Sequence, residues 1–195
     1  MRSMMKVRAA IAAAVIAAAL TIPANAFAYL TWFEFARQSN TASTLTMVWQ
    51  YGTGYYGTQS WRAGSGASTD ACWIGHGWLP VGYYDLKGHW DYYDGTIKGR
   101  VFYLQNKPCW NGTWRTELFV HSEETAGQGQ YCPTAGDDPY CWEGASDYYS
   151  NGCIKVSRAG YPSDLRLVHD GWHGKSSDYR HGYFTINNWL YVRDG

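Results

Sequence analysis

The sequence predicts a mainly β fold with one or two short helices, and three observations lead to this prediction. Runs of β-branched and aromatic residues alternate with polar residues at the two-residue period of a strand. Glycine and proline separate these runs at short intervals, as turns between strands do. The 195 residues include 17 Tyr, 11 Trp and 6 Phe, a composition that excludes disorder, collagen-like repeats and coiled coils.

The first 28 residues have the features of a secretory signal peptide that is cleaved off. Residues 1–8 contain three basic and no acidic side chains, residues 9–22 are apolar, and small residues stand at the positions that signal peptidase requires. The apolar run is too short to cross ~30 Å of hydrocarbon, which argues against a membrane anchor. We therefore expect the protein outside the cytoplasm, in the extracellular space or cell wall, or in the periplasm of a Gram-negative cell.

Residues 29–195 are expected to form one domain without a membrane span. They carry 13 basic and 16 acidic side chains, a formal net charge of −3, which argues against a nucleic-acid partner. We expect this domain to be a monomer that uses no cofactor.

A hairpin opens the predicted sheet. Residues 44–50 alternate Leu, Met and Trp with mostly polar neighbours, which indicates a half-buried strand. The Gly-Thr-Gly sequence at 52–54 turns the chain, and residues 55–61 return as the partner strand. A glycine-rich connection at 62–68 then leads away from the hairpin.

Three further strands are expected before residue 122. In residues 77–86 a Pro-x-Gly sequence turns into a short strand, and residues 100–105 and 116–121 are rich in strand-forming residues. The polar stretch at 122–149 is expected to be a long loop, and loops of that length are commonly functional.

The C-terminal part is expected to hold one short helix and two short strands. Residues 163–169 form the helix, with Ser163 as its cap and Gly171 ending it. Residues 183–192 form the strands, broken at Asn187-Asn188.

Five histidines are assigned no catalytic role. His76 and His89 are expected in loops, and His181 in the C-terminal tail. His169 and His173 are four residues apart, which suits metal binding on a helix. Glycines at 171 and 174 argue against a continuous helix there, and no third ligand is apparent, so no metal site is predicted.

Five cysteines cannot all pair within one chain. Cys132 and Cys141 flank a short acidic loop that a local disulfide would close, and Cys72 and Cys109 then join two segments of the N-terminal half. Cys153 is left over. Spacing alone leaves open whether its thiol is reactive, pairs between molecules or lies inert in the core.

The segment 150–156 (SNGCIKV) places the odd cysteine directly after Gly152, at the end of a polar loop. A glycine lets a carbonyl group approach the backbone, where the N–H groups around Asn151, Gly152 and Cys153 would meet an oxyanion. A free thiol titrates near ~8.5 and needs a base. His121 is the best candidate for this base, and the alternative is a hydrogen-bonded core histidine.

These residues resemble the L,D-transpeptidase (YkuD-type) catalytic domain. The similarity consists of a strand-terminal histidine, a variable loop, and Ser-x-Gly-Cys-Ile with a basic residue two positions after the cysteine. The RAGSG turn at 62–66 and the Pro-x-Gly-x-Tyr strand within 77–86 are also similar to the family and stand in the same order. The resemblance covers residues 44–156 and is especially close to secreted members that act on peptidoglycan.

The resemblance implies a secreted cysteine acyltransferase that acts on peptidoglycan stem peptides. Its activity would be that of an L,D-transpeptidase, an L,D-carboxypeptidase or a D-amino-acid exchange enzyme. Cys153 would be the nucleophile and His121 its general base, while Ser150, Asn151 and Gly152 would shape the turn and the oxyanion hole.

The resemblance also implies roles around this pair. The backbone carbonyl of Ser122 would orient the catalytic histidine, and Lys155 would bind a substrate carboxylate. Trp142, Tyr148 and Tyr149 would line the peptide groove or, alternatively, belong to the core.

The sequence departs from the family at two points. Asn151 replaces the second histidine of the commoner Ser-His-Gly-Cys form, and 31 residues separate His121 from Cys153, which is more than usual. The additional length is interpreted as a lid or specificity insertion closed by Cys132 and Cys141.

Two other functions remain open. The aromatic segments at 55–61 and 88–95 suit a non-catalytic cell-wall or carbohydrate-binding protein. A small structural or inhibitory domain, with Cys153 paired between chains, is the third possibility.

Overall fold

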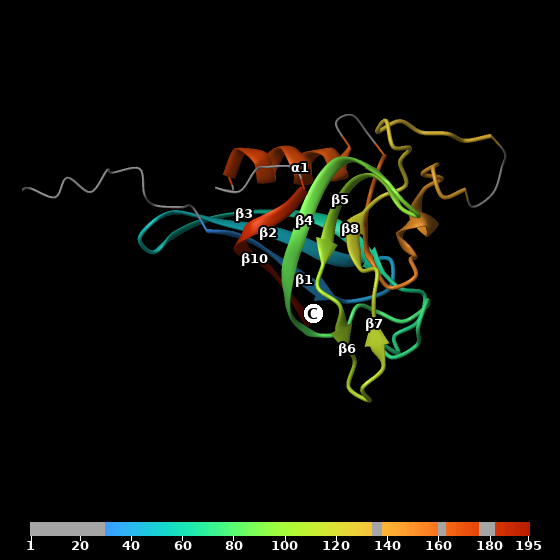
Figure 1. The fold of residues 1–195 in the computed structure, drawn as a ribbon, viewed down its shortest axis with the longest axis horizontal. Helices are drawn as coiled ribbons and strands as arrows, with labels where there is room; N and C mark the ends of the chain where they lie inside the picture. Colours follow the sequence, from blue (N-terminus) through green and yellow to red (C-terminus); the bar gives the residue numbers. More distant parts are fainter. Residues whose placement is uncertain (1–29, 134–137, 160–162, 176–181) are drawn as a thin grey trace, which may run out of the picture.

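The structure is a computed structural model that describes residues 30–133, 138–159, 163–175 and 182–195 (Figure 1). The expected signal peptide and His181 lie outside the described residues. Within these residues, regular structure consists mainly of strands, with one α-helix and one short 3-10 helix, in agreement with the predicted mainly β class.

The elements follow one another along the chain with these bounds: β1 Thr31–Arg37, β2 Ser43–Gly52, β3 Tyr55–Ser65, β4 Gly82–Asp94, β5 Lys98–Leu104, β6 Lys107–Pro108, β7 Trp114–Arg115, β8 Phe119–His121, η1 Ala145–Tyr148, β9 Ile154–Val156, α1 Asp164–Lys175 and β10 Gly182–Asp194.

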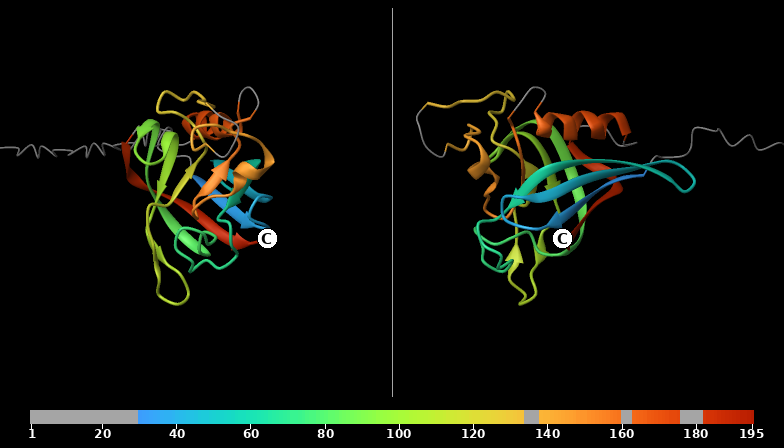
Figure 2. Two further views of the ribbon diagram at one scale, coloured as in Figure 1. Left: turned by 90° about the vertical axis from the view of Figure 1, so that its right-hand side faces the viewer. Right: turned by 180° about the vertical axis from the view of Figure 1, so that it is seen from behind.

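Eight strands close into a barrel, in the order β1-β10-β4-β5-β8-β9-β3-β2 (Figures 1 and 2). β1 pairs with β10 in parallel, β8 pairs with β9 in parallel, and the other neighbours in the barrel are antiparallel. β6 and β7 form a separate hairpin below the barrel in Figure 1.

The interior of the barrel is one hydrophobic core. Side chains of a strand point alternately to its two faces, so every second residue reaches the inside. Phe33 and Phe35 on β1 lie opposite Met47 and Leu45 on β2, and all four are fully buried. They belong to the same cluster as Phe102 on β5.

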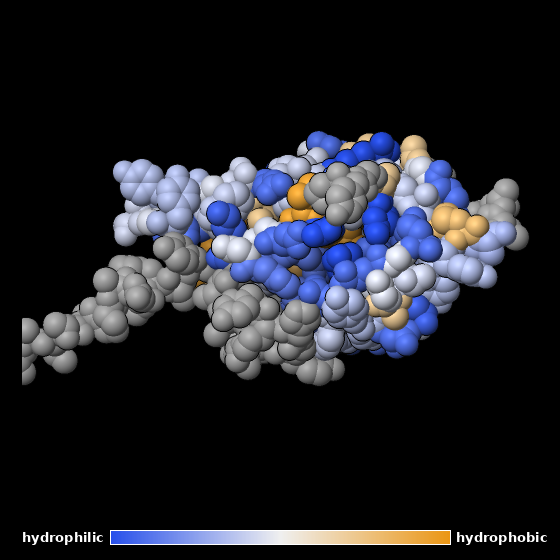
Figure 3. Space-filling model, turned by 90° about the horizontal axis from the view of Figure 1, so that it is seen from above, coloured by the Kyte–Doolittle hydropathy of each residue, from blue (hydrophilic) through white to orange (hydrophobic). Residues whose placement is uncertain are grey.

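Helix α1 lies across the barrel, against β2 and β5 (Figure 2). Leu165, Val168 and Trp172 insert from α1 into the core, where the Trp172 ring stacks on Phe33 with centroids 5.0 Å apart. Seen from the side that carries α1, the described surface is mostly hydrophilic, with hydrophobic residues in small separate areas (Figure 3). The expected cap is confirmed, since Ser163 Oγ accepts the backbone N–H of Arg166 at 3.2 Å.

The expectation that glycines end this helix was wrong. α1 continues through Gly171 and Gly174 to Lys175. A glycine inside a helix costs about 1 kcal/mol relative to alanine, and full burial of Trp172 between them offsets this. Gly171 also lies where a Cβ would overlap the terminal methyl of Met47. His169 and His173 therefore lie on one continuous helix.

Several other elements differ in length from the expectation. β3 includes residues 62–65 of the expected connection, and β4 is a long strand that contains His89, which was expected in a loop. β10 is a single strand rather than two, although its pairing with β4 is irregular between Tyr183 and Asn188. β8 begins only at Phe119, because Glu117 adopts a φ of 54°, which a strand does not accommodate.

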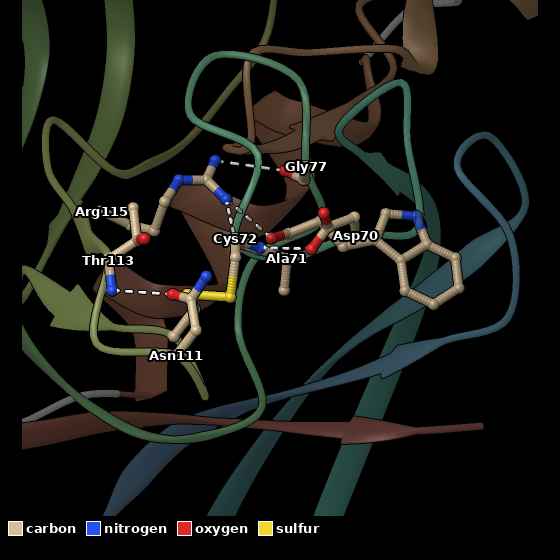
Figure 4. The surroundings of a disulfide bond; sticks show 9 residues. Asp70, Ala71, Cys72, Gly77, Asn111, Thr113 and Arg115 are labelled. Atoms are coloured by element: carbon tan, nitrogen blue, oxygen red, sulfur yellow. Dashed lines mark hydrogen bonds between the residues drawn. A yellow bond between two sulfur atoms is a disulfide. The ribbon is translucent and has the colours of Figure 1, made fainter.

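Both expected disulfides are present: Cys72 pairs with Cys109 and Cys132 with Cys141, while Cys153 is free. The first bridge joins the loop before β4 to the β6–β7 hairpin (Figure 4). Two disulfides indicate an oxidising compartment such as the extracellular space or the periplasm. Among the described residues, no helix is both long and apolar enough for a membrane span.

Candidate active site

Cys153 and His121 come from neighbouring strands. β8 and β9 run parallel, with Val120 opposite Ile154 and His121 opposite Lys155. Val120 and Ile154 belong to the barrel core. Because side chains alternate along a strand, His121 and Cys153 point to the outer face of the barrel.

A cavity of about 780 Å³ lies over these two strands, and both the Cys153 thiol and the His121 ring line it. The loop between the two residues, which Figure 1 draws in yellow to orange, contributes many of the residues that line this cavity. The lining residues from that loop are Glu123, Pro139, Glu143, Asp147, Tyr149, Ser150 and Asn151. The segment interpreted as an insertion thus lies beside the candidate nucleophile.

The Cys153 side chain is only 6% exposed, and it reaches solvent space through the cavities that it lines. Its thiol donates a hydrogen bond to the carbonyl of Glu117 at 3.5 Å. Burial raises the pKa of Cys153 to about 11, although the positive charges of Arg115 and Lys155 oppose this shift. The resting thiol is therefore protonated at neutral pH.

The His121 ring is oriented by its own backbone neighbour. Nδ1 lies 2.9 Å from the Ser122 carbonyl oxygen, as expected from the sequence. A carbonyl oxygen can only accept, so Nδ1 carries the proton and Nε2 has the free lone pair. Burial lowers the pKa of His121 to about 4, which keeps the ring neutral and able to accept a proton.

Ser150 fixes the turn before the cysteine. Its hydroxyl donates to the Cys153 carbonyl at 2.7 Å and accepts the N–H groups of Gly66 at 2.9 Å and Gly152 at 3.2 Å. The contact with Gly66 ties the expected glycine turn at 62–66 to this motif. Because the Gly152 N–H is engaged by Ser150, it does not point at a substrate oxygen, contrary to the expectation.

Gly152 is needed for a different reason from the one expected. Its φ of 111° is open only to glycine, and a Cβ there would overlap the guanidinium of Arg115. The missing side chain therefore makes room for an arginine rather than for a substrate carbonyl.

Arg115 is the residue of the site that sequence reasoning missed. Its buried guanidinium donates to four backbone carbonyls. They are those of Ala71 at 2.5 Å and Gly77 at 3.2 Å, both labelled in Figure 4, and those of Trp78 and Asn151 at 3.2 Å. No motif marks this arginine. It lies on the two-residue strand β7, close to the Cys72–Cys109 bridge, so its role depends on the tertiary fold.

Lys155 is not free to bind a substrate carboxylate. Its ammonium group forms a buried ion pair with Glu123, which sequence reasoning also missed. Burial raises the pKa of Glu123 to about 7, although Lys155 opposes this shift. The pair places a proton-binding carboxyl group in the cavity wall.

The aromatic residues divide between the two roles that the sequence left open. Tyr149 is exposed and lines the cavity, whereas Tyr148 is buried, with the Arg62 guanidinium 4.2 Å from its ring centroid. Trp142 packs edge-on against Tyr148. Asn151 is exposed and lines the cavity too.

Comparisons with protein-family models, with curated proteins and with solved structures found no match for this chain.

Proposed function

We propose that this protein is a secreted cysteine acyltransferase of the L,D-transpeptidase type that acts on peptidoglycan stem peptides. One observation carries the proposal. A free cysteine and a neutral, oriented histidine from adjacent parallel strands line the same cavity. The Ser-Asn-Gly-Cys turn and the position of the histidine at the end of its strand agree with the family that the sequence resembles.

The pKa values argue against a resting thiolate–imidazolium pair. With a thiol pKa of about 11 and an imidazole pKa of about 4, both groups are neutral before substrate binds. The proton leaves Sγ for Nε2 of His121 only as the Cys153 sulfur attacks the substrate carbonyl carbon. The positive charges of Arg115 and Lys155 stabilise the negative charge that develops during this attack.

In the acylation step, a carbon–sulfur bond replaces a carbon–nitrogen bond. A carbon–sulfur bond forms at the carbonyl that precedes the terminal D-amino acid, and the oxyanion meets the backbone N–H groups of Asn151 and Cys153. The carbon–nitrogen bond breaks, and His121 returns the proton to the leaving amine. The resulting thioester is attacked by an amine, which gives a cross-link or an exchange, or by water, which gives a carboxypeptidase product.

Mass spectrometry of isolated muropeptides tests this proposal. Wild-type protein should release the terminal D-amino acid, exchange it or produce dimers, and Cys153→Ala should do none of these. Alkylation of the native protein should modify one site, which the same substitution removes. Unchanged muropeptides with correctly folded wild type, or equal products from both proteins, would refute the proposal.

A second candidate is a non-catalytic wall- or carbohydrate-binding protein, and exposed aromatic side chains favour it. Trp110 and Trp114, next to and on the β6–β7 hairpin, are 85% and 61% exposed. Flat aromatic faces suit sugar rings. Binding to insoluble peptidoglycan that depends on these tryptophans, without any muropeptide change, would favour this candidate.

A further inference from the structure

Three histidines and an aspartate meet between β4 and α1, outside the lining of the Cys153 cavity. His89 Nε2 lies 3.0 Å from His169 Nδ1 and 3.2 Å from His173 Nε2. Asp91 Oδ1 lies 3.5 Å from His89 Nε2 and 3.3 Å from His169 Nδ1. The ligand atoms of His89, Asp91 and His169 thus lie within 4.8 Å of one another.

The residue repeat of the strand and that of the helix place these side chains on facing sides of the two elements. His89 and Asp91 are two residues apart on β4, so they point to the same face of the strand. His169 and His173 are four residues apart on α1 and share one face of the helix. The continuous helix also brings His173 Nε2 to 3.2 Å from His89 Nε2.

His89 Nε2 is the centre of these contacts, with three polar neighbours within 3.5 Å. A neutral imidazole offers one lone pair to a metal ion. A cation would accept one lone pair from each of His89, Asp91 and His169 at once.

The spacing fits a tetrahedral transition-metal ion. Zinc binds histidine nitrogen at about 2.0–2.1 Å and carboxylate oxygen at about 2.0–2.2 Å, which places tetrahedral ligand atoms about 3.3–3.5 Å apart. The three separations among His89 Nε2, His169 Nδ1 and Asp91 Oδ1 are 3.0, 3.3 and 3.5 Å, close to this value.

The surroundings also suit a structural metal site. His89 and His169 are 0% and 1% exposed, and the Phe102 ring packs on both, with centroids 4.9 and 4.4 Å away. Such an apolar shell restricts solvent access and holds the rings in place. With three protein ligands, a water molecule would complete the tetrahedron.

We infer that His89, Asp91 and His169 bind one Zn²⁺ ion, which fastens α1 to β4. The site is independent of Cys153 and of the proposed acyl transfer. Its function is to hold the helix whose side chains fill the barrel core.

Zinc titration of the full secreted chain, first stripped of metal with a chelator, tests the inference. Calorimetry should give one Zn²⁺ per chain, and elemental analysis after dialysis should give the same ratio. Loss of an outer hydrogen-bond partner lowers metal affinity about 10–100-fold, so the loss of affinity when a direct ligand is removed in His169→Gln or Asp91→Asn should exceed about 100-fold. Zinc should raise the unfolding temperature of the wild type and not of these variants.

Two controls separate this site from other zinc ligands. His76→Gln removes a histidine outside the cluster, and Cys153→Ala removes the free thiol, and both should retain the wild-type affinity. Because His169 is fully buried, Asp91→Asn and the visible spectrum of wild-type protein with Co²⁺ provide readouts that do not depend on a severe core substitution. A spectrum typical of tetrahedral Co²⁺ supports the site. Absence of zinc binding by folded wild type, unchanged affinity in Asp91→Asn, or loss of binding in Cys153→Ala would overturn it.

Discussion

The packing of Arg115 against Gly152 predicts that Gly152→Ala is much more destabilising than an ordinary glycine substitution. A residue with a side chain at a φ of 111° costs about 1–3 kcal/mol in backbone strain. Its Cβ would also displace the Arg115 guanidinium, whose hydrogen bonds to the carbonyls of Gly77 and Asn151 would be lost.

A hydrogen bond that involves a charged group contributes about 1.5–3 kcal/mol. Adding these two losses, about 4 kcal/mol together, to about 2 kcal/mol of strain gives an expected decrease of about 6 kcal/mol in the free energy of unfolding. This is a large part of the ~5–15 kcal/mol that stabilises a typical domain. Urea unfolding followed by tryptophan fluorescence measures the decrease.

Gly54→Ala is the matched control. Gly54 has a φ of 77°, and no atom lies within 4 Å of the position its Cβ would occupy. It should therefore lose only the backbone term of about 1–2 kcal/mol. Equal losses in the two variants would refute the described contact between Gly152 and Arg115.

Two further predictions concern the disulfides and the pH dependence of stability. Loop-closure entropy predicts that removing the Cys72–Cys109 bridge, which spans 37 residues, lowers the free energy of unfolding by about 4 kcal/mol, and that removing Cys132–Cys141, which spans 9, lowers it by about 3 kcal/mol. Urea unfolding of the two double alanine variants tests the order, and a larger loss for the shorter loop would contradict it. The pKa of Glu123 is raised to about 7 in the folded state, whereas the unfolded chain releases this proton near 4.5. Between these two pH values the folded state binds more protons, so Glu123 makes the free energy of unfolding fall as pH rises from 4.5 to 7. Glu123→Gln should reduce that slope, Glu34→Gln should leave it unchanged, and an unaltered slope in Glu123→Gln would show that the carboxyl does not hold the proton.

Much of the barrel could be predicted because the alternation of apolar and polar residues indicates which face of a strand is buried. β2, β3 and β5 each overlap a segment expected from that pattern. β1 was missed although Phe33 and Phe35 alternate with polar or small residues, since a short strand directly after a leader carries no turn signal of its own. The second half of α1 could not be predicted, because it is stabilised by the burial of Trp172 in a core formed by strands that are distant in the sequence. The neighbouring glycines alone indicate the opposite, an end of the helix.

The residues of the candidate site likewise fall into those that the sequence could predict and those that it could not. Cys153, Ser150 and His121 stand in short motifs whose chemistry depends on neighbouring residue types, so the sequence was sufficient to find them. Arg115 and Glu123 act through partners that the fold brings together, the Asn151 carbonyl and the Lys155 ammonium group. The same holds for the cluster between β4 and α1, because a strand residue and a helix residue about 80 positions apart meet there.

The order of strands around the barrel has a consequence for how the chain folds. β10 follows every other described strand in the sequence, yet it lies between β1 and β4. During synthesis, which begins at the N-terminus, β1 and β4 each keep an unpaired edge until β10 has been made. Such edges promote association with other chains. Closure joins residues as distant as Phe33 and Leu190, a separation that makes folding slow. The polypeptide is thus exposed to aggregation until its last segment has emerged, and a chaperone that shields those two edges would be expected to raise the yield of native protein.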